Sequence, residues 1–173
     1  DGAVAIQQLI VARTSAELAP SNVYAASKAA AWAFGAMYAR AAAWPIHGAM
    51  IFQAYGPGQP PGMLLPAALR AARAGQDFPM TAGQQEKDWI YVDDVAAGLL
   101  ALLGRDLPPG ATAELGTGQT TAVRAVVERL YALVGRGGQP LPGALPSRPG
   151  EAPRHAADAA ATAVLIGWRA RVG

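Results

Sequence analysis

The stretch Ser21-Asn-Val-Tyr-Ala-Ala-Ser-Lys-Ala-Ala-Ala31 decides how this chain can fold. Proline, serine and asparagine at positions 20–22 form a helix-start signal. The alanine-rich run that follows predicts a long helix from Val23 to Ala42, which must stop before Pro45. Tyr24 and Lys28 are four residues apart in this helix, so their side chains share one face.

A tyrosine beside a lysine can move a proton on or off a substrate hydroxyl. A free tyrosine has a pKa of about 10, and lowering it to about 7 requires roughly 4 kcal/mol of preferential phenolate stabilisation. One cation about 4 Å away, at an effective dielectric constant of about 20, supplies roughly that much. The pair Tyr24 and Lys28 is therefore a candidate acid/base site.

Composition bounds the class of protein. The chain has 173 residues, of which 52% are hydrophobic and 15% charged, which is typical of one globular domain with a core. A net charge of +2 without a basic cluster gives no sign of a nucleic-acid or membrane-surface partner. The sequence contains no cysteine, which excludes disulfides, thiol catalysis and thiolate metal sites. The longest uncharged apolar run, 29–39, is too short to span a bilayer, and the first residues lack a basic signal-peptide start. We expect a cytoplasmic protein.

Alternating apolar runs and helix signals predict an α/β fold with some parallel strand pairing. Residues 3–13 are an apolar stretch of ambiguous type. Beyond the first helix we expect strands at Ile46–Phe52, Trp89–Val92 and Thr112–Leu115, helices at Met63–Ala74, 93–103 and about 158–166, and a striped helix opening at Thr120. Residues 55–62 and 135–150 are expected to be loops, because they are rich in proline and glycine.

Five motifs follow one another in an order that is more specific than any one of them. The first is the Tyr-x-x-x-Lys stretch, and the second is Ile51-Phe-Gln-Ala-Tyr-Gly-Pro-Gly-Gln59. Then come Gln85-Glu-Lys-Asp-Trp-Ile-Tyr-Val-Asp-Asp-Val95, Glu114-Leu-Gly-Thr-Gly118, and Arg148-Pro-Gly-Glu151 with the later Gly167-Trp168. Together they resemble the C-terminal half of extended short-chain dehydrogenases/reductases of the NAD-dependent nucleotide-sugar epimerase/dehydratase type.

The resemblance implies a partial Rossmann-like fold, comprising the C-terminal part of a doubly wound sheet and a small α/β substrate lobe. It implies that residues 1–62 belong to the dinucleotide-binding domain. Residues 63–173 would form mainly the substrate lobe, with elements returning to the main sheet. Tyr24 would be the catalytic acid/base, and Lys28 would bind the nicotinamide ribose. Ile51 would also contact the cofactor, which is expected to be NAD, with NADP left open.

The same resemblance assigns a substrate side that grips a nucleoside-diphosphate sugar. Lys87 and Arg148 would bind the diphosphate, and Glu151 would accept from the nucleotide ribose. Gln53 and Met80 would contact the substrate, Met80 by packing against the base. Three positions depart from the family pattern: Gln53 replaces an asparagine, Lys87 an arginine, and Met50 a frequent arginine.

Part of the family pattern is not in these 173 residues. The glycine-rich turn that holds the cofactor pyrophosphate is expected roughly a hundred residues before Tyr24. The family's catalytic Ser or Thr would fall just before Asp1, and we expect Thr14 and Ser15 to be too close to Tyr24 for that role. We therefore expect a fragment that by itself catalyses no NAD-dependent turnover.

Two other functions stay open on the sequence. One is a short-chain reductase of a smaller carbonyl substrate, and the other is a non-catalytic module that binds sugar nucleotides or a partner. The resemblance implies a homodimer through the helix that carries Tyr24, and the small-residue run Ala29-Ala-Ala-Trp-Ala-Phe-Gly35 permits the close helix packing that such a dimer needs. Asp88, Asp93 and Asp94 are interpreted as local hydrogen-bonding and helix-capping residues, with no metal site. No role is assigned to His47 or His155.

Overall fold

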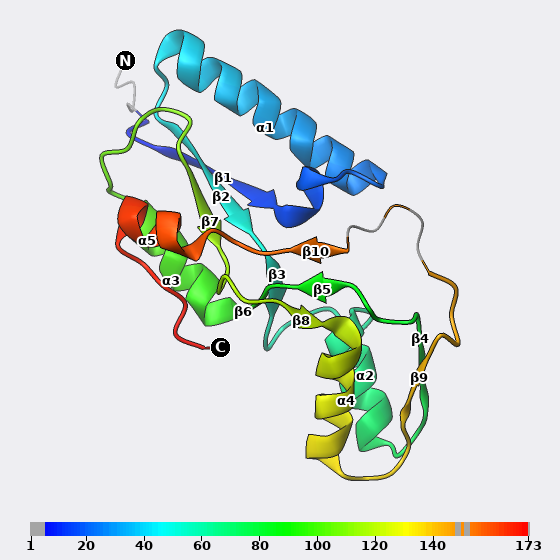
Figure 1. Cartoon of the computed structure of the whole chain (residues 1–173). Helices are drawn as coiled ribbons and strands as arrows, with labels where there is room; N and C mark the ends of the chain where they lie inside the picture. Colours follow the sequence, from blue (N-terminus) through cyan, green and yellow to red (C-terminus); the bar gives the residue numbers. More distant parts are fainter. Residues whose placement is uncertain (1–5, 148–149, 151–152, 173) are drawn as a thin grey trace.

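The computed structural model describes residues 6–147, 150 and 153–172. It shows an α/β molecule with a main parallel sheet at one end and a smaller lobe at the other (Figure 1). The main sheet has the strand order β1–β2–β7, with β1 at Leu9–Thr14, β2 at Ile46–Ile51 and β7 at Thr112–Leu115. Both pairings are parallel, and Leu9 lies opposite Ile46 while Gly48 lies opposite Thr112. A parallel sheet of this kind needs cover on both faces.

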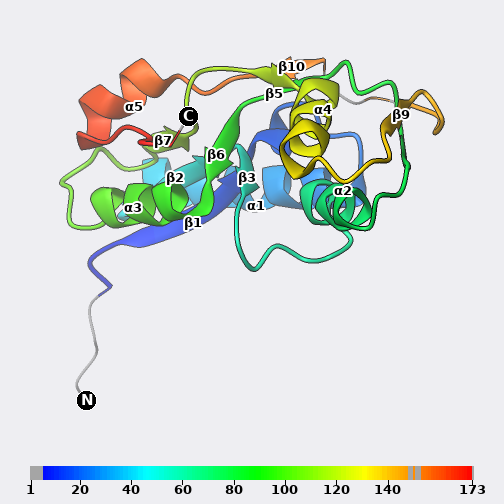
Figure 2. The same ribbon diagram turned by 90° about the horizontal axis from the view of Figure 1, so that it is seen from below.

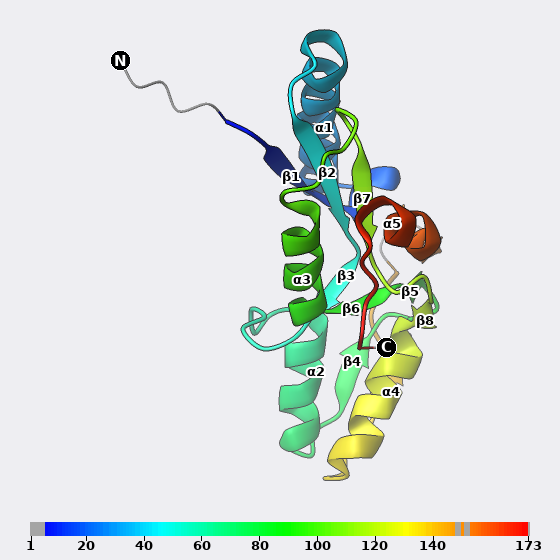
Figure 3. The same cartoon turned by 90° about the vertical axis from the view of Figure 1, so that its left-hand side faces the viewer.

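Helix α1, Val23–Ala42, covers one face of the main sheet, and its bounds are those that the sequence predicts. It begins at Asn22, whose side chain accepts a hydrogen bond from the backbone N–H of Ala25 at 2.9 Å. Helices α3, Val92–Leu102, and α5, Ala159–Ile166, cover the opposite face (Figure 3). Between them and the sheet lies the main core, made of Ala49, Ile90, Val95, Leu102, Ala113, Leu115, Ile166 and Trp168.

The smaller lobe is built from helices α2, Leu64–Arg73, and α4, Val123–Val134, which lie side by side (Figure 2). Short strands complete it and link it to the main sheet: β3 at Gln53–Tyr55, β4 at Phe78–Met80, β5 at Glu86–Lys87, β6 at Trp89–Tyr91, β8 at Thr121–Ala122, β9 at Pro140–Pro142 and β10 at Arg154–His155. They pair as β3–β6, β4–β9 and β10–β5–β8. Each of these pairs joins segments that are separated along the chain.

Asp88 fastens three segments where the two parts of the molecule meet. It is 1% exposed. Its Oδ1 accepts from the backbone N–H and the hydroxyl of Thr117, both at 2.7 Å. Its Oδ2 accepts from the backbone N–H groups of Gly118 at 2.8 Å and Ala157 at 3.0 Å. Gly116 permits this approach, since a Cβ there would lie 2.6 Å from Oδ2. The expectation of a merely local role for Asp88 was therefore wrong.

Other details differ from the sequence prediction. The ambiguous stretch 3–13 contributes most of strand β1, and a 3₁₀ turn, η1, follows the strand at Ser15–Leu18. The N-cap of α3 is Tyr91, so Asp93 and Asp94 lie in its first turn and do not cap it. Asp94 instead accepts from the backbone N–H groups of Arg171 and Val172, at 3.0 and 2.9 Å, and holds the C-terminal segment. Strand β9 lies inside the stretch predicted as a loop. No described helix is long and apolar enough to cross a membrane.

Candidate active site

An open cleft of about 670 Å³ lies at the carboxyl ends of β1 and β2. In open α/β sheets this is the edge where ligands bind, since the connecting loops converge there. The residues that line it come from the β1 end, α1, the β2–β3 segment, β5 and β10, and they include Thr14, Ser15, Tyr24, Lys28, Ile51, Gln53, Lys87 and His155. The structure thus brings together five of the eight site residues that the sequence predicts.

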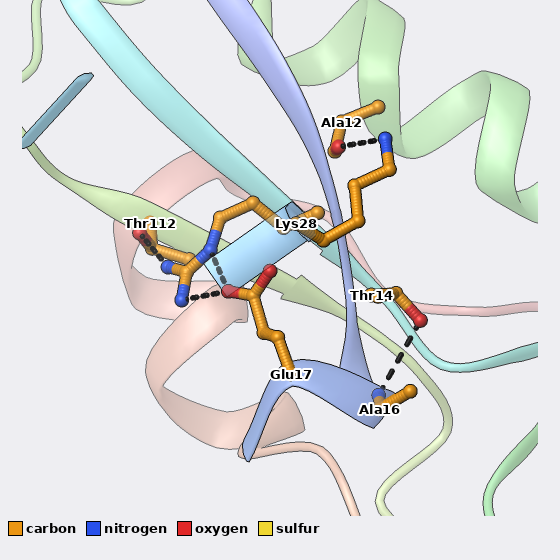
Figure 4. A network of polar contacts seen from close by, with 7 residues as sticks. Ala12, Thr14, Ala16, Glu17, Lys28 and Thr112 are labelled. Atoms are coloured by element: carbon orange, nitrogen blue, oxygen red, sulfur yellow. Dashed lines mark hydrogen bonds and ion pairs between the residues drawn. The ribbon is translucent and has the colours of Figure 1, made fainter. Parts of the chain in front are cut away.

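The first turns of α1 present Tyr24 and Lys28 to the cleft. The Tyr24 side chain is accessible, with the residue 57% exposed. The Lys28 ammonium donates a hydrogen bond to the carbonyl oxygen of Ala12 at 3.1 Å (Figure 4). This contact holds the ammonium at the C-terminal end of strand β1, two residues before Thr14. The cleft therefore has a positive charge where this strand ends.

A buried ion pair between Arg13 and Glu17 lies next to the β1 end of the cleft. Arg13 donates from Nε to Oε1 of Glu17 at 2.5 Å, and its Nη2 also pairs with that oxygen. Its Nη1 donates to the Thr112 hydroxyl at 2.9 Å (Figure 4). Its guanidinium lies 4.3 Å from the ring centre of Trp32. The pair joins η1 to β7 under the helix. Oε2 of Glu17 is buried and has no hydrogen-bond partner among the described residues.

The far side of the cleft is formed by the first residue of β3 and by the strands of the lobe. Gln53 begins β3, and its backbone N–H donates to the carbonyl oxygen of Asp88 at 2.9 Å. Lys87 is the last residue of β5 and lies directly opposite His155 of β10 in the parallel register. Burial, and then the charge of Lys87, lower the pKa of His155 below its ordinary value. The imidazole is therefore favoured in its neutral form when the cleft is empty of anions.

Tyr55, which belongs to the Gly-Pro-Gly motif, is not among the residues that line the cleft. Its ring packs edge-to-face on Tyr91 with 5.6 Å between ring centres. Burial, and then the charges of Asp94 and Tyr91, raise the pKa of Tyr55. It therefore stays protonated at neutral pH.

Three predicted site residues are not placed in the cleft. Met80 is 3% exposed in the core between α2 and α4 and does not line the cleft, so its side chain has almost no surface to offer a nucleotide base. The role proposed for Met80 has no support in this geometry. Arg148 and Glu151 lie outside the described residues.

Sequence reasoning excluded two residues that the structure places in the cleft. Thr14 and Ser15 were expected to be too close to Tyr24 along the chain to be the family's catalytic Ser or Thr. They end β1 and open η1, and both line the same cleft as Tyr24. Closeness along the chain does not keep them out of the cleft, because a strand that ends beside the start of α1 needs only a short turn to connect them. His155 was also missed, since nothing in the sequence showed that β10 pairs with β5.

Sequence comparison supplies the family. A model of the NAD dependent epimerase/dehydratase family matches residues 3–116. The chain belongs to this family. Among its relatives, the low-salt glycan biosynthesis protein Agl12 of Haloferax volcanii is 31% identical over 152 residues, covering 87% of this chain and 48% of Agl12. The dTDP-glucose 4,6-dehydratase of Neisseria gonorrhoeae is 30% identical over 161 residues, covering 87% and 46%. The chain thus spans about half the length of the curated relatives it matches.

Solved structures show the same fold. The UDP-glucuronic acid 4-epimerase from Bacillus cereus, in complex with UDP-glucuronic acid and NAD, superposes with a TM-score of 0.86 at 20% identity, covering 98% of this chain and 58% of that one. DesIV, a dTDP-glucose 4,6-dehydratase from Streptomyces venezuelae with NAD and TYD bound, gives a TM-score of 0.83 at 20% identity, covering 97% and 56%. The expected partial Rossmann-like fold of an extended short-chain dehydrogenase is confirmed.

Proposed function

We propose that this chain provides the acid/base pair and the sugar-nucleotide side of an enzyme that transfers hydride at a sugar carbon of a nucleoside-diphosphate sugar. The observation that carries this proposal is the placing of Tyr24, Lys28, Gln53 and Lys87 around one cleft at the carboxyl ends of parallel strands. Family membership, and relatives whose names specify sugar-nucleotide chemistry, support it.

The residues at the β1–α1 corner fit an NAD cofactor. Lys28 offers a cation and a donor, Thr14 and Ser15 offer hydroxyls, and Ile51 with Phe52 offers an apolar surface for a flat ring. Two NAD-containing structures share this fold. When bound, NAD supplies the acceptor for the hydride that leaves the sugar carbon.

Tyr24 is proposed to take the proton of the sugar hydroxyl as the hydride leaves, and to return it in the reverse direction. The Lys28 ammonium, one turn along α1 from Tyr24, offers a donor to a hydroxyl-bearing ligand such as the nicotinamide ribose. Lys87, on the opposite side of the cleft, neutralises part of the substrate diphosphate charge. The two lysines thus hold the substrate at its two ends. The hydride then transfers between groups that are already positioned for the reaction.

The described lining of the cleft contains no carboxylate. Elimination of water from a sugar needs one group to remove a carbon-bound proton and another to protonate the leaving hydroxyl. Glu17, in the turn after β1, is held by Arg13 beneath α1. Chemistry at one hydroxyl, as in epimerisation or keto reduction, needs only the Tyr24 pair described here, whereas dehydration needs a further acid or base beyond these residues. Mass analysis of the nucleotide product separates the two, because dehydration gives a product lighter by one water.

The central test is Tyr24→Phe in the whole, NAD-loaded enzyme turning over a nucleoside-diphosphate sugar. Loss of a general acid/base lowers turnover by about 10²–10⁴-fold. Tyr38→Phe is the matched control, since Tyr38 is on the same helix but stacks on Trp44, 4.8 Å away between ring centres. It is expected to keep the wild-type rate. Equal rates for wild type and Tyr24→Phe would remove Tyr24 from the mechanism.

Two alternatives make different predictions. A reductase of a smaller carbonyl has no diphosphate to bind, so Lys87→Ala would leave its substrate affinity unchanged. A non-catalytic module would bind a sugar nucleotide without any transfer of hydride to NAD. Two measurements on the same samples separate both alternatives from the proposed enzyme: the affinity for the sugar nucleotide, and the absorbance change when NAD is reduced.

We further propose that α1 forms a homodimer. Its exposed apolar residues include Phe34, Met37 and Tyr38, which are 66%, 40% and 43% exposed. Burying them against a second copy removes apolar surface from water. Phe34→Glu is expected to shift the mass measured by light scattering to that of a monomer, and an unchanged mass would place any interface elsewhere.

A further inference from the structure

His155 is a titratable group in the cleft to which the proposed function gives no role. It lies on β10, directly opposite Lys87 of β5 in a parallel pair. Residues that face one another in register on adjacent strands project from the same side of the sheet. Both residues line the cleft, so that side faces the cleft. The strands therefore present an imidazole next to an ammonium at the place where a substrate binds.

The one acidic residue of strands β5 and β10, Glu86, lies on the face opposite to Lys87 and His155. Glu86 and Arg154 are the preceding register pair, and their side chains form an ion pair of 3.4 Å. Glu86 also accepts from the Thr120 hydroxyl at 2.8 Å. Strand alternation thus separates the charges. The negative charge of Glu86 is paired with Arg154 on one face of the strands. Lys87 and His155 lie on the opposite face, which lines the cleft.

The described groups around His155 do not favour a protonated imidazole. The charged or titratable side chains that line the cleft with it are Arg13 from β1, Tyr24 and Lys28 from α1, and Lys87 from β5. None is a carboxylate. Burial and the Lys87 charge lower the pKa of His155. A substrate anion placed between Lys87 and His155 reverses this balance, because it interacts favourably with both positive charges.

We propose that His155 is a second, proton-gated ligand for the substrate diphosphate, and that it takes up a proton when the nucleoside-diphosphate sugar binds beside Lys87. This inference rests on the proposed function, since it assumes a diphosphate in the cleft. The diphosphate is assigned as the anion because every nucleoside-diphosphate sugar carries one. A carboxylate on the sugar has the same chemistry, and the experiment distinguishes the two.

The sign of the pH effect follows from linkage. His155 is neutral in the free protein above its lowered pKa and is charged in the complex. Affinity is therefore highest below the free pKa, falls between the free and bound pKa values, and is constant above the bound value. We expect the dissociation constant to rise several-fold from pH 6 to pH 8.

The test is calorimetric titration of the chain with UDP-glucose at pH 6, 7 and 8. Titrations in two buffers of different ionisation enthalpy count the protons taken up. A diphosphate esterified at both ends does not titrate in this range, so an uptake belongs to the protein. His155→Gln is expected to remove the proton uptake and the pH dependence while keeping the wild-type affinity at pH 8. His155→Arg, with a permanent charge, is expected to bind several-fold tighter than wild type at pH 8 and equally well at all three pH values.

Three outcomes would overturn the proposal. Binding with the same pH dependence in wild type and His155→Gln removes His155 alone and leaves the proposed function intact. A pH dependence seen with UDP-glucuronic acid but not with UDP-glucose assigns the anion to the sugar carboxylate and refutes the diphosphate assignment. No binding of UDP-glucose or dTDP-glucose at any pH removes the proposed substrate class and this inference with it.

Discussion

The strongest stability prediction concerns Asp88→Asn, which changes one buried oxygen to an NH₂ group. Of its four accepted hydrogen bonds, two come from Thr117, one from Gly118 and one from Ala157. The best orientation of the amide keeps its oxygen toward Gly118 and Ala157. The reason is that the Thr117 hydroxyl can turn and accept from an NH₂ group, whereas a backbone N–H cannot.

The expected loss of stability follows from the hydrogen bonds that this orientation of the amide cannot make. The backbone N–H of Thr117 is left without its acceptor, and a stranded buried group costs about 1–3 kcal/mol. The other bonds lose their charge assistance, which removes roughly 1 kcal/mol more. We expect destabilisation of about 3 kcal/mol. For a chain of this size, about 2–4 °C per kcal/mol gives a fall in melting temperature of about 6–12 °C.

Urea unfolding followed by circular dichroism, with a thermal scan, measures this change. Asp93→Asn is the matched control, because Asp93 is exposed in the first turn of α3. Only its interaction with the helix dipole is lost, and its cost is below about 1 kcal/mol. If Asp88→Asn also costs less than about 1 kcal/mol, the carboxylate does not hold the three segments together and the reasoning fails.

Three further changes test the packing of the main sheet by urea unfolding. Gly48→Ala places a Cβ 2.6 Å from the Thr112 hydroxyl oxygen, so we expect a loss of about 1–3 kcal/mol, and an unchanged midpoint would contradict the close packing. Ala43→Gly relieves a left-handed residue with φ of 52° after α1 and is expected to stabilise by about 0.5–1 kcal/mol, whereas a loss would refute the strain. Arg13→Met strands the buried Glu17 carboxylate and is expected to cost about 3–5 kcal/mol; the double variant Arg13→Met/Glu17→Leu should cost less than half of that, and additive costs would show that the pair is not coupled.

The elements that local chemistry specifies could be predicted from sequence. Helix α1 has the predicted bounds because Asn22 supplies its cap and Pro45 limits its extent. Strand β7 at Thr112–Leu115 was also predicted as it is observed. The order of motifs identified the family, and the spacing of Tyr24 and Lys28 placed both in the cleft.

The features that sequence did not predict depend on pairing between distant segments. Strands β5, β8 and β10 have two residues each, too few for a periodic pattern, and they exist because they pair with one another. The long-range role of Asp88 and the presence of His155 in the cleft follow from those pairings. Burial of Met80 between α2 and α4 likewise depends on how the lobe packs.

These long-range pairings also bear on how the molecule folds. The β1–α1–β2 unit is continuous in sequence, whereas Asp88 must find Ala157 across 69 positions, and the Asp77 side chain must find the backbone of Gln139 across 62. Closing such long loops costs conformational entropy before any contact is gained, and chains dominated by distant contacts fold slowly. We expect the unit that carries Tyr24 to form first and β10 to dock late. The proposed proton-transfer pair would then exist before the side of the cleft that we propose binds the substrate.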